Sequence, residues 1–526
     1  MPAVVLVSLS PAWVSAQAPP LEPIESVEIG QHREFRVNGE PFLPLMLWLH
    51  SEVRIEDGLS IGVNTFAGNG GELSPDAYMQ QLSDAGLYGV LHLHRDIAGH
   101  DHLLAWIHRD EPDMPERVSE ARITPGPDLK PNPSTPLHRL VDGKPFNWAV
   151  LDPLEGAEVT IKLQEPATIE AVALRLTISE RLARAKEVTF LSDGQPLLRA
   201  ELENRKGEQR FELDNPTRIE QLTLRVESVY PGDRVWGSIS EVLAYTSEDE
   251  NVLLAPTVDQ ARTPVEEVAE VYQRARAMEP VRPMLVTFTT HFASWSNRYD
   301  TAYQQEIYPR YVRHADVIGY DLYPIFGYNK PEWLDRVGRG VTQLRELAGD
   351  KPVYAWIETS KGSRWIDYDE QLDVEPRHTR AETWMALIRG ATAIGYFTHR
   401  WHPSYEQFGI SEPMRAELAE LNARLTRLAP ALLAAPAERE IAMELQADDE
   451  SIPQHFKVTR HEGHVYLFAQ NIDMDERAGQ ARFRVEGLEA GTEIEVLDEE
   501  RTIRADSEAF GDAFDPLQVH VYRWPQ

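Results

Sequence analysis

Short apolar runs alternate with helix-like segments over two separate stretches of the chain. The runs are nearly continuous in hydrophobic character, as in strands that are buried on both faces of a parallel sheet. Four lie in each stretch, at 42–50, 62–68, 88–94 and 103–111, and at 283–292, 315–324, 351–360 and 390–399. Eight such strands alternating with helices predict an α/β fold, a (β/α)₈ or TIM barrel whose two halves are separated in sequence.

Capping patterns indicate where two helices of the second half begin. Thr263 precedes Pro264 and Glu266, which predicts an N-cap, a first helical residue and a capping box. Thr379 and Glu382 show the same spacing before the last predicted strand. We expect both pairs to sit at helix N-termini.

Between the two halves, and again at the end of the chain, apolar and polar residues alternate with a period of two. Runs such as those around 158–176 and 219–226 are bounded by turn residues, as in antiparallel strands. We therefore expect a barrel over 22–118 and 251–435, an inserted β-sandwich over 119–250 and a C-terminal antiparallel β-sandwich over 436–526. The Pro-rich stretch 124–136 falls where a linker into the insert is expected.

Composition narrows the classes of partner. The 526 residues carry a formal charge of −33, which disfavours nucleic acid and anionic membrane surfaces. No Cys is present, so disulfides and thiolate sites are excluded. The first 20 residues contain an apolar stretch and a small-x-small site, typical of a signal peptide for a secreted or periplasmic protein, although a positive start is lacking; a disordered tail is the alternative. No run is long enough to span a membrane, and the oligomeric state is open.

Carboxylates stand at the ends of two predicted barrel strands. Asp110 and Glu111 end the fourth strand and Glu358 ends the seventh. A barrel gathers the C-terminal ends of its strands around one cup, where active sites of this fold lie. Two carboxyl groups across a sugar ring supply the proton donor and the nucleophile or base that glycoside hydrolysis needs. The structural alternative is a pair of surface carboxylates at helix N-termini.

These residues resemble clan A retaining glycoside hydrolases, such as the family 42 and family 5 barrels. The resemblance covers about 22–115 and 251–430 and rests on carboxylates after strands four and seven, with Pro after the first Glu. It implies Glu111 as acid/base, Glu358 as nucleophile, and Tyr323, or else Tyr320, as the hydroxyl that orients Glu358. Asp110 stands where that clan usually has Asn, which leaves the chemistry next to the reacting sugar open. No cofactor is expected.

The insert resembles the discoidin, or coagulation-factor type C, jelly roll of many carbohydrate-binding modules. The resemblance rests on segments 142–152 and 157–176 and, most specifically, on 236–246. This resemblance implies sugar binding and a possible structural Ca²⁺, whereas the plain alternative is an insert that shapes a cleft or mediates dimer contacts.

Side chains near the strand ends are candidates for contacting a poly- or oligosaccharide. Aromatic rings stack on sugar faces, and polar groups bind hydroxyls; for each residue alone, ordinary packing is the alternative. The candidates are Asp110, Trp48, His291, Trp295, Asp321, Tyr323, Trp356 and Trp401, with Trp365, His50 and His399 nearby.

Two competing functions stay open. A barrel that binds carbohydrate without turning it over is favoured by Asp110. A metal-dependent hydrolase is the third choice, because His92 and His94, and His100 with His102, have metal-ligand spacing, with His291 and Asp321 as further donors. We expect no catalytic metal, since no complete ligand set is obvious.

Overall fold

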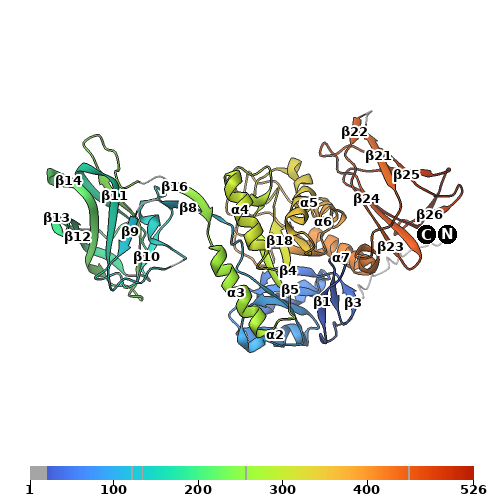
Figure 1. The fold of residues 1–526 in the computed structure, drawn as a ribbon, viewed down its shortest axis with the longest axis horizontal. Coiled ribbons are helices and arrows are strands. Elements are labelled where there is room, and N and C mark those ends of the chain that lie inside the picture. The colour runs from blue at the N-terminus through green and yellow to red at the C-terminus, as the bar shows by residue number, and fades with distance from the viewer. Residues whose placement is uncertain (1–19, 120–121, 133, 255–256, 448–449) are drawn as a thin grey trace, which may run out of the picture. The chain divides into compact units, whose positions relative to one another are not determined.

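The computed structural model contains a closed barrel of eight parallel strands (Figure 1). The structure describes residues 20–119, 122–132, 134–254, 257–447 and 450–526, so the expected signal peptide or tail lies outside the described residues. Each predicted barrel strand is present, and the α/β barrel prediction is confirmed. In barrel order from the first half, the strands are β4 (Leu45–His50), β5 (Thr65–Asn69), β6 (Tyr88–His92), β7 (Leu103–Ile107), β17 (Met284–Phe288), β18 (Val317–Asp321), β19 (Val353–Glu358) and β20 (Ala393–Phe397).

Large side chains of β19 fill the barrel interior. A Cβ on Gly319 of β18 would lie 2.0 Å from the ring of Tyr354, and one on Gly395 of β20 would lie 2.0 Å from Trp356. The hydroxyl oxygens of Thr287 and Tyr354 are 2.7 Å apart, and the indole N–H of Trp356 donates to the Thr287 hydroxyl at 3.2 Å. Glycines on the flanking strands therefore make room for two bulky rings that close the barrel core.

Helices cover the outside of the barrel and short elements connect them. The α-helices are α1 (Ile55–Ser60), α2 (Pro75–Asp84), α3 (Val265–Met278), α4 (Thr301–Val312), α5 (Asp335–Ala348), α6 (Pro376–Ile388) and α7 (Glu412–Leu432). The 3₁₀ turns are η1 (Glu52–Arg54), η2 (Arg95–Ile97), η4 (Thr290–Phe292) and η5 (Pro331–Trp333), and a small antiparallel sheet joins β1 (Val27–Ile29), β2 (Phe35–Val37) and β3 (Glu40–Phe42).

Both capping predictions miss the observed helix starts. α3 has Pro264 at its N-cap position and no side-chain cap, so Thr263 lies one residue too early. α6 begins at Pro376 with Glu375 as N-cap and His378 completing the box, which places Thr379 and Glu382 inside the helix. The Glu-Pro start, with proline at the first helical position, was the better signal.

The C-terminal region is an antiparallel β-sandwich, as predicted. One sheet has the order β22 (Glu450–Ile452), β21 (Ile441–Ala447), β25 (Gly479–Val485), β28 (Ala509–Phe514). The other has the order β23 (Phe456–His461), β24 (His464–Gln470), β29 (Val519–Pro525), β26 (Glu493–Val496), β27 (Arg501–Arg504). It packs on the barrel through Phe468, whose ring stacks on Trp384 of α6, and Gln470, whose amide donates to the Ala381 carbonyl at 3.1 Å.

The insert forms a second compact unit, Pro115–Arg262, with its own hydrophobic core. It is wider than the expected 119–250 because the antiparallel pair β8 (Pro115–Ser119) and β16 (Thr257–Ala261) forms its base. The main sheet runs β10 (Ala149–Leu151), β15 (Gly237–Tyr245), β11 (Glu158–Leu176), β14 (Gly207–Tyr230), β12 (Arg184–Ser192), β13 (Gln195–Glu201), with β9 (Arg122–Pro125) on β11 and the turn η3 (Leu137–Val141) beside it. Register shifts divide β11, whose first part pairs with β9 and whose last part pairs with β15, so one strand serves both layers of a β-sandwich.

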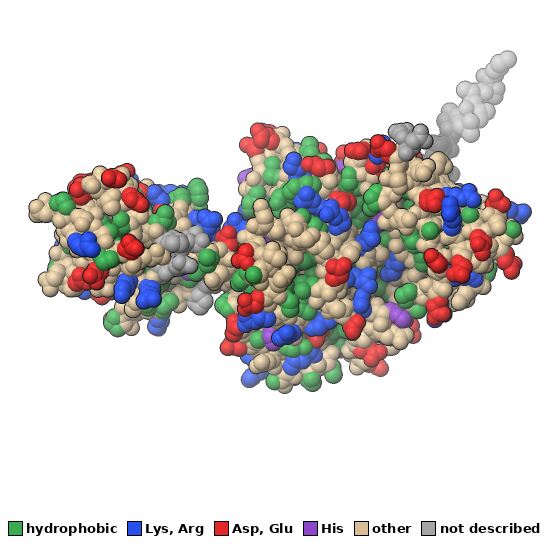
Figure 2. All heavy atoms as spheres, turned by 45° about the horizontal axis from the view of Figure 1, so that its top comes forward, with side chains coloured by type: hydrophobic (Ala, Val, Ile, Leu, Met, Phe, Trp, Pro, Cys, Tyr) green, Lys and Arg blue, Asp and Glu red, His purple; other side chains and the backbone are tan. Residues whose placement is uncertain are grey.

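Charge is spread over the face of the molecule that Figure 2 shows. In the face that Figure 2 shows, Asp and Glu side chains are scattered among Lys and Arg and gather in no single patch. No helix in the described part of the chain is both long and apolar enough to cross a membrane.

Candidate active site

Two carboxyl groups meet at the C-terminal ends of β7 and β18. Glu111 follows β7 with a left-handed backbone, φ 46°, and Asp321 is the last residue of β18. Their side chains share a hydrogen bond, and Asp110 is close enough to act on Asp321 electrostatically. All three are partly buried, neither sealed in the core nor fully in water. The structure thus joins the expected catalytic residue Glu111 to Asp321, which was expected to bind substrate or, in the metal alternative, an ion.

Burial and neighbouring negative charge disfavour full ionisation of this pair. Burial raises the pKa of Asp321 well above its ordinary range, and Glu111 and Asp110 raise it further. Two carboxylates that touch cannot both ionise, because each disfavours the charge on the other. The pair therefore favours a state in which its two members share a proton.

Asp113 anchors the loop that carries Glu111. It is 0% exposed and accepts hydrogen bonds from the Thr289 amide at 2.9 Å, the Thr289 hydroxyl at 2.7 Å and the Tyr308 hydroxyl at 2.7 Å. The Tyr299 hydroxyl also donates to its carbonyl oxygen. Burial raises the pKa of Asp113 to about 7 in spite of these donors. The loop after β7 is thereby fixed to the end of β17, and sequence reasoning did not single out this residue.

Glu358 ends β19, as predicted, but its carboxylate does not face open space. The side chain is 0% exposed. It accepts hydrogen bonds from the Ile325 amide at 2.9 Å and the Phe326 amide at 2.6 Å. Burial raises the pKa of Glu358 to about 7. In this conformation a substrate has no access to Glu358, which instead holds the loop after β18.

A second buried carboxyl group, Glu382 of α6, lies beside Glu358. It is 0% exposed, and its side chain lies against the Glu358 carboxyl group. Burial and the nearby Glu358 carboxylate hold the pKa of Glu382 well above its ordinary range. Thr379, the other residue of the expected capping box, donates from its hydroxyl to the Glu358 carbonyl at 2.8 Å. Both residues therefore support the end of β19 from the helix layer.

An aromatic cluster borders the carboxyl pair. The ring of Tyr323 stacks on Phe397 with 4.8 Å between centroids, and Phe397 stacks on Trp401 at 5.7 Å. Trp401 in turn contacts Trp365 and Tyr405, which are 63% and 57% exposed. Burial and Asp321 raise the pKa of Tyr323 well above its ordinary range, so its phenol stays a proton donor beside the carboxyl groups. The cluster offers flat apolar faces that lead outward from the carboxyl pair.

The remaining residues that were expected to contact substrate lie in different surroundings. Trp48 and Trp356 contact each other at 5.1 Å and are 7% and 2% exposed, so Trp356 in particular is core. Trp295 lies under the guanidinium groups of Arg336 and Arg339 of α5. The further expected residues are placed as follows: His291 hydrogen-bonds Ser296 at 3.0 Å, His399 hydrogen-bonds the Trp48 carbonyl at 2.9 Å, and Tyr320 donates to Val337, away from Glu358.

The metal alternative finds no support at the cup. Within the described ranges, the only three His, Asp or Glu side chains whose ligand atoms converge are His100, Asp101 and His102, which precede β7 rather than follow it. His92 is engaged with the Ile107 carbonyl at 3.1 Å. The described part of the insert brings no three such groups together, and its expected Ca²⁺ stays a prediction.

Comparisons with known proteins give distant structural likenesses. Neither the protein-family models nor the curated proteins gave a match. The family 32 carbohydrate-binding module of Clostridium perfringens NanJ in complex with galactose covers 24% of this chain and 98% of its own, at 11% identity and a TM-score of 0.21. An α-amylase from Geobacillus thermoleovorans complexed with acarbose covers 51% of this chain and 58% of its own, at 11% identity and a TM-score of 0.34. A putative chitobiase fragment from Bacteroides thetaiotaomicron covers 25% and 93%, at 13% identity and a TM-score of 0.21. Similarities this low leave the functional argument to the chemistry of the chain itself.

Proposed function

We propose that the barrel is a retaining glycoside hydrolase acting on a poly- or oligosaccharide, with Asp321 as proton donor and Glu111 as nucleophile. The observation that carries this proposal is the hydrogen-bonded carboxyl pair at the ends of β7 and β18. Glycoside hydrolysis needs one protonated and one ionised carboxyl group, and the pair holds one proton between two groups. The Glu358 assigned as nucleophile from sequence is replaced because its carboxylate is sealed.

The spacing of the pair supports retention of configuration. Inverting enzymes keep their carboxyl groups about 6.5–9.5 Å apart to hold a water between them, whereas retaining enzymes keep them about 5–5.5 Å apart. Groups that hydrogen-bond directly leave no room for that water. The substrate has to part them slightly, so that the glycosidic oxygen takes the proton that Asp321 shares with Glu111.

The reaction then proceeds in two displacements. Glu111 attacks the anomeric carbon while Asp321 gives its proton to the departing oxygen, and a glycosyl ester forms on Glu111. Asp321, now ionised, takes a proton from water, and this water attacks the anomeric carbon and releases the sugar with Glu111 restored. Tyr323 donates a hydrogen bond beside the reacting groups, and the ring faces of Trp401 and Trp365 stack on neighbouring sugar units. Export from the cytoplasm and sugar binding by the insert are further parts of the proposal.

Azide rescue assigns the roles. Hydrolysis of a panel of aryl glycosides is measured, with and without azide, for the wild-type protein, for alanine variants at positions 111, 321 and 358, and for Glu358→Gln. We expect Glu111→Ala to recover with azide and yield the glycosyl azide of inverted configuration, and Asp321→Ala to yield the azide of retained configuration. Glu358→Gln should keep measurable turnover without azide.

Each other pattern overturns a specific part of the proposal. An inverted azide from Glu358→Ala would return the nucleophile to Glu358. Sugar binding without turnover across the whole panel would identify a carbohydrate-binding barrel instead. Loss of activity on chelation, with the fold intact, would point to the metal-dependent hydrolase.

A further inference from the structure

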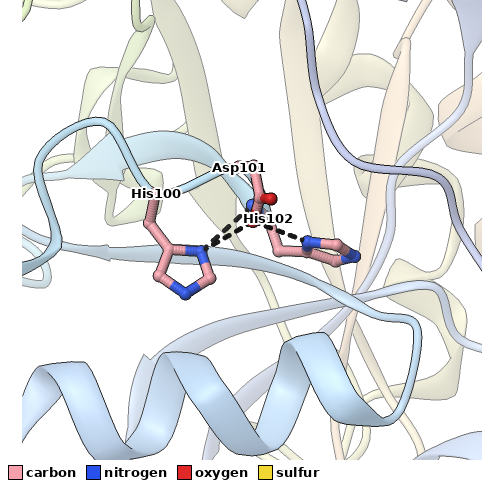
Figure 3. A group of neighbouring side chains, drawn as sticks. All are labelled: His100, Asp101 and His102. Atoms are coloured by element: carbon pink, nitrogen blue, oxygen red, sulfur yellow. Dashed lines mark hydrogen bonds and ion pairs between the residues drawn. The ribbon is translucent and has the colours of Figure 1, made fainter.

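Three potential metal ligands face one another at the end of the barrel opposite the carboxyl pair. His100, Asp101 and His102 immediately precede β7, whereas Glu111 follows its last residue. The Asp101 carboxylate lies between the two imidazoles, 3.4 Å from His100 Nδ1 and 3.1 Å from His102 Nδ1 (Figure 3). All three ligand atoms lie within 4.8 Å of one another. Ligands of one tetrahedral Zn²⁺ ion, at about 2.0–2.1 Å from the metal, are separated by a little over 3 Å, so two of the contacts already have the required size.

The backbone of this tripeptide is held from several sides. The Asp101 carbonyl accepts from the Ile24 amide at 2.6 Å, and the His102 carbonyl accepts from the Gly89 amide at 2.8 Å. The His100 carbonyl accepts from the Leu103 amide at 3.0 Å and from Arg282 at 3.3 Å. Three segments distant in sequence therefore fix one short turn. A site on such a turn is preorganised, and binding needs little further ordering of the chain.

His100 and Asp101 already present lone pairs, whereas His102 needs a change of tautomer. His100 Nδ1 accepts the backbone N–H of His102 at 3.1 Å, so this nitrogen has a lone pair rather than a proton. The His102 ring is only 6% exposed; it packs edge-on against Tyr88, and its Nδ1 lies 3.2 Å from the Ser83 hydroxyl. His102 Nδ1 lies 3.1 Å from the Asp101 carboxylate and donates to it, so the His102 proton moves to Nε2 when a metal binds.

We propose that His100, Asp101 and His102 form a binding site for a divalent transition metal, with Zn²⁺ as the representative ion. Two imidazole nitrogens and one carboxylate oxygen suit Zn²⁺, Ni²⁺ and Cu²⁺ better than Mg²⁺ or Ca²⁺, which prefer all-oxygen sites. Water completes the coordination on the side of Asp101, which is exposed. The metal displaces the His102 N–H from His100 Nδ1, so we expect micromolar rather than nanomolar affinity. Its position before β7 makes the role structural and separate from hydrolysis.

Calorimetric titration of the chelator-treated full chain with Zn²⁺ tests the site. We expect one site that is at least tenfold weaker in His100→Ala and in Asp101→Asn. His94→Ala is the matched control, because His94 is an exposed histidine next to Asp96, 3.6 Å away, and should leave affinity unchanged. Thermal unfolding should shift upward with Zn²⁺ in the wild type and in His94→Ala, since a ligand that binds the folded state stabilises it.

Co²⁺ gives a second readout that does not depend on stability. A visible absorption band of a tetrahedral or five-coordinate ion should appear with the wild-type chain and be lost in His100→Ala. Equal Zn²⁺ affinity in wild type and His100→Ala would overturn the proposal. Equal affinity of the folded chain and the urea-unfolded chain would also overturn it, because the tripeptide would then bind without the fold.

Discussion

Replacing Asp113 with Asn should change how the stability of the barrel depends on pH. Asp113 is fully buried, and its pKa is about 7 instead of the ordinary 3.8. A carboxyl group whose pKa is raised by folding stabilises the folded state at low pH, and this contribution is lost as pH rises toward the folded pKa. A rise of about 3 in pKa corresponds to a loss of about 4 kcal/mol of folding stability as the pH rises from below 3.8 to above 7. About 2.5 kcal/mol of this loss occurs between pH 5 and pH 8.

The variant isolates this contribution from the other titrating groups. Asn has nearly the same shape, keeps an acceptor for the Thr289 amide and cannot ionise. The free energy of unfolding of Asp113→Asn minus that of the wild type should therefore increase by about 2.5 kcal/mol from pH 5 to pH 8. Asp113→Ala is the contrasting variant: it also cannot ionise, but it strands three buried donors, so it should be about 3–5 kcal/mol less stable than Asp113→Asn at both pH values.

Urea unfolding followed by near-ultraviolet circular dichroism at several pH values gives these differences. A pH-independent difference between Asp113→Asn and the wild type would refute the reasoning, since it would mean that burial does not outweigh the three donors. Hydrolysis by Asp113→Asn adds a functional readout. If Asp113 fixes the loop of Glu111, kcat should fall while KM for the same glycoside changes little.

Three further predictions concern other parts of the chain. Glu382→Leu removes one of two neighbouring buried carboxyl groups and should stabilise the barrel by about 1–2 kcal/mol, seen as a higher Tm. Trp365→Ala removes an exposed stacking face and should raise KM for oligosaccharides several-fold while leaving KM for small aryl glycosides unchanged. Phe146→Ala, combined with Trp148→Ala, should weaken retention on polysaccharide affinity gels without changing hydrolysis of small substrates. The reason is that both rings are exposed on the insert, at 84% and 44%.

The architecture could be predicted from the sequence because its signals are local. A buried parallel strand reads as a continuous apolar run wherever it occurs, so all eight barrel strands were visible without knowledge of their partners. The ends of the strands were also visible, which placed Glu111, Asp321 and Glu358 at the same end of the barrel.

The direction of a side chain at a strand end has no such local signal. Whether Glu358 faces the cup depends on the path of the loop at Ile325 and Phe326, whose amides capture its carboxylate. Asp113 and Glu382 were missed or misread for the same reason, because a buried carboxyl group has the same letter as one on the surface. Only the tertiary environment distinguishes a helix cap from a carboxyl group that supports a strand.

The pairing of β7 with β17 has a consequence for synthesis of the chain. These strands are neighbours in the closed barrel, yet the whole unit Pro115–Arg262 lies between them in sequence. At roughly 5–20 residues per second, a ribosome needs on the order of ten seconds or more to add that unit. During this interval β7 is an open sheet edge, the kind of surface that recruits wrong strands. The insert can complete its own core in the meantime. The order of synthesis therefore favours a folded β-sandwich attached to half a barrel, and the barrel closes only when β17 has been synthesised.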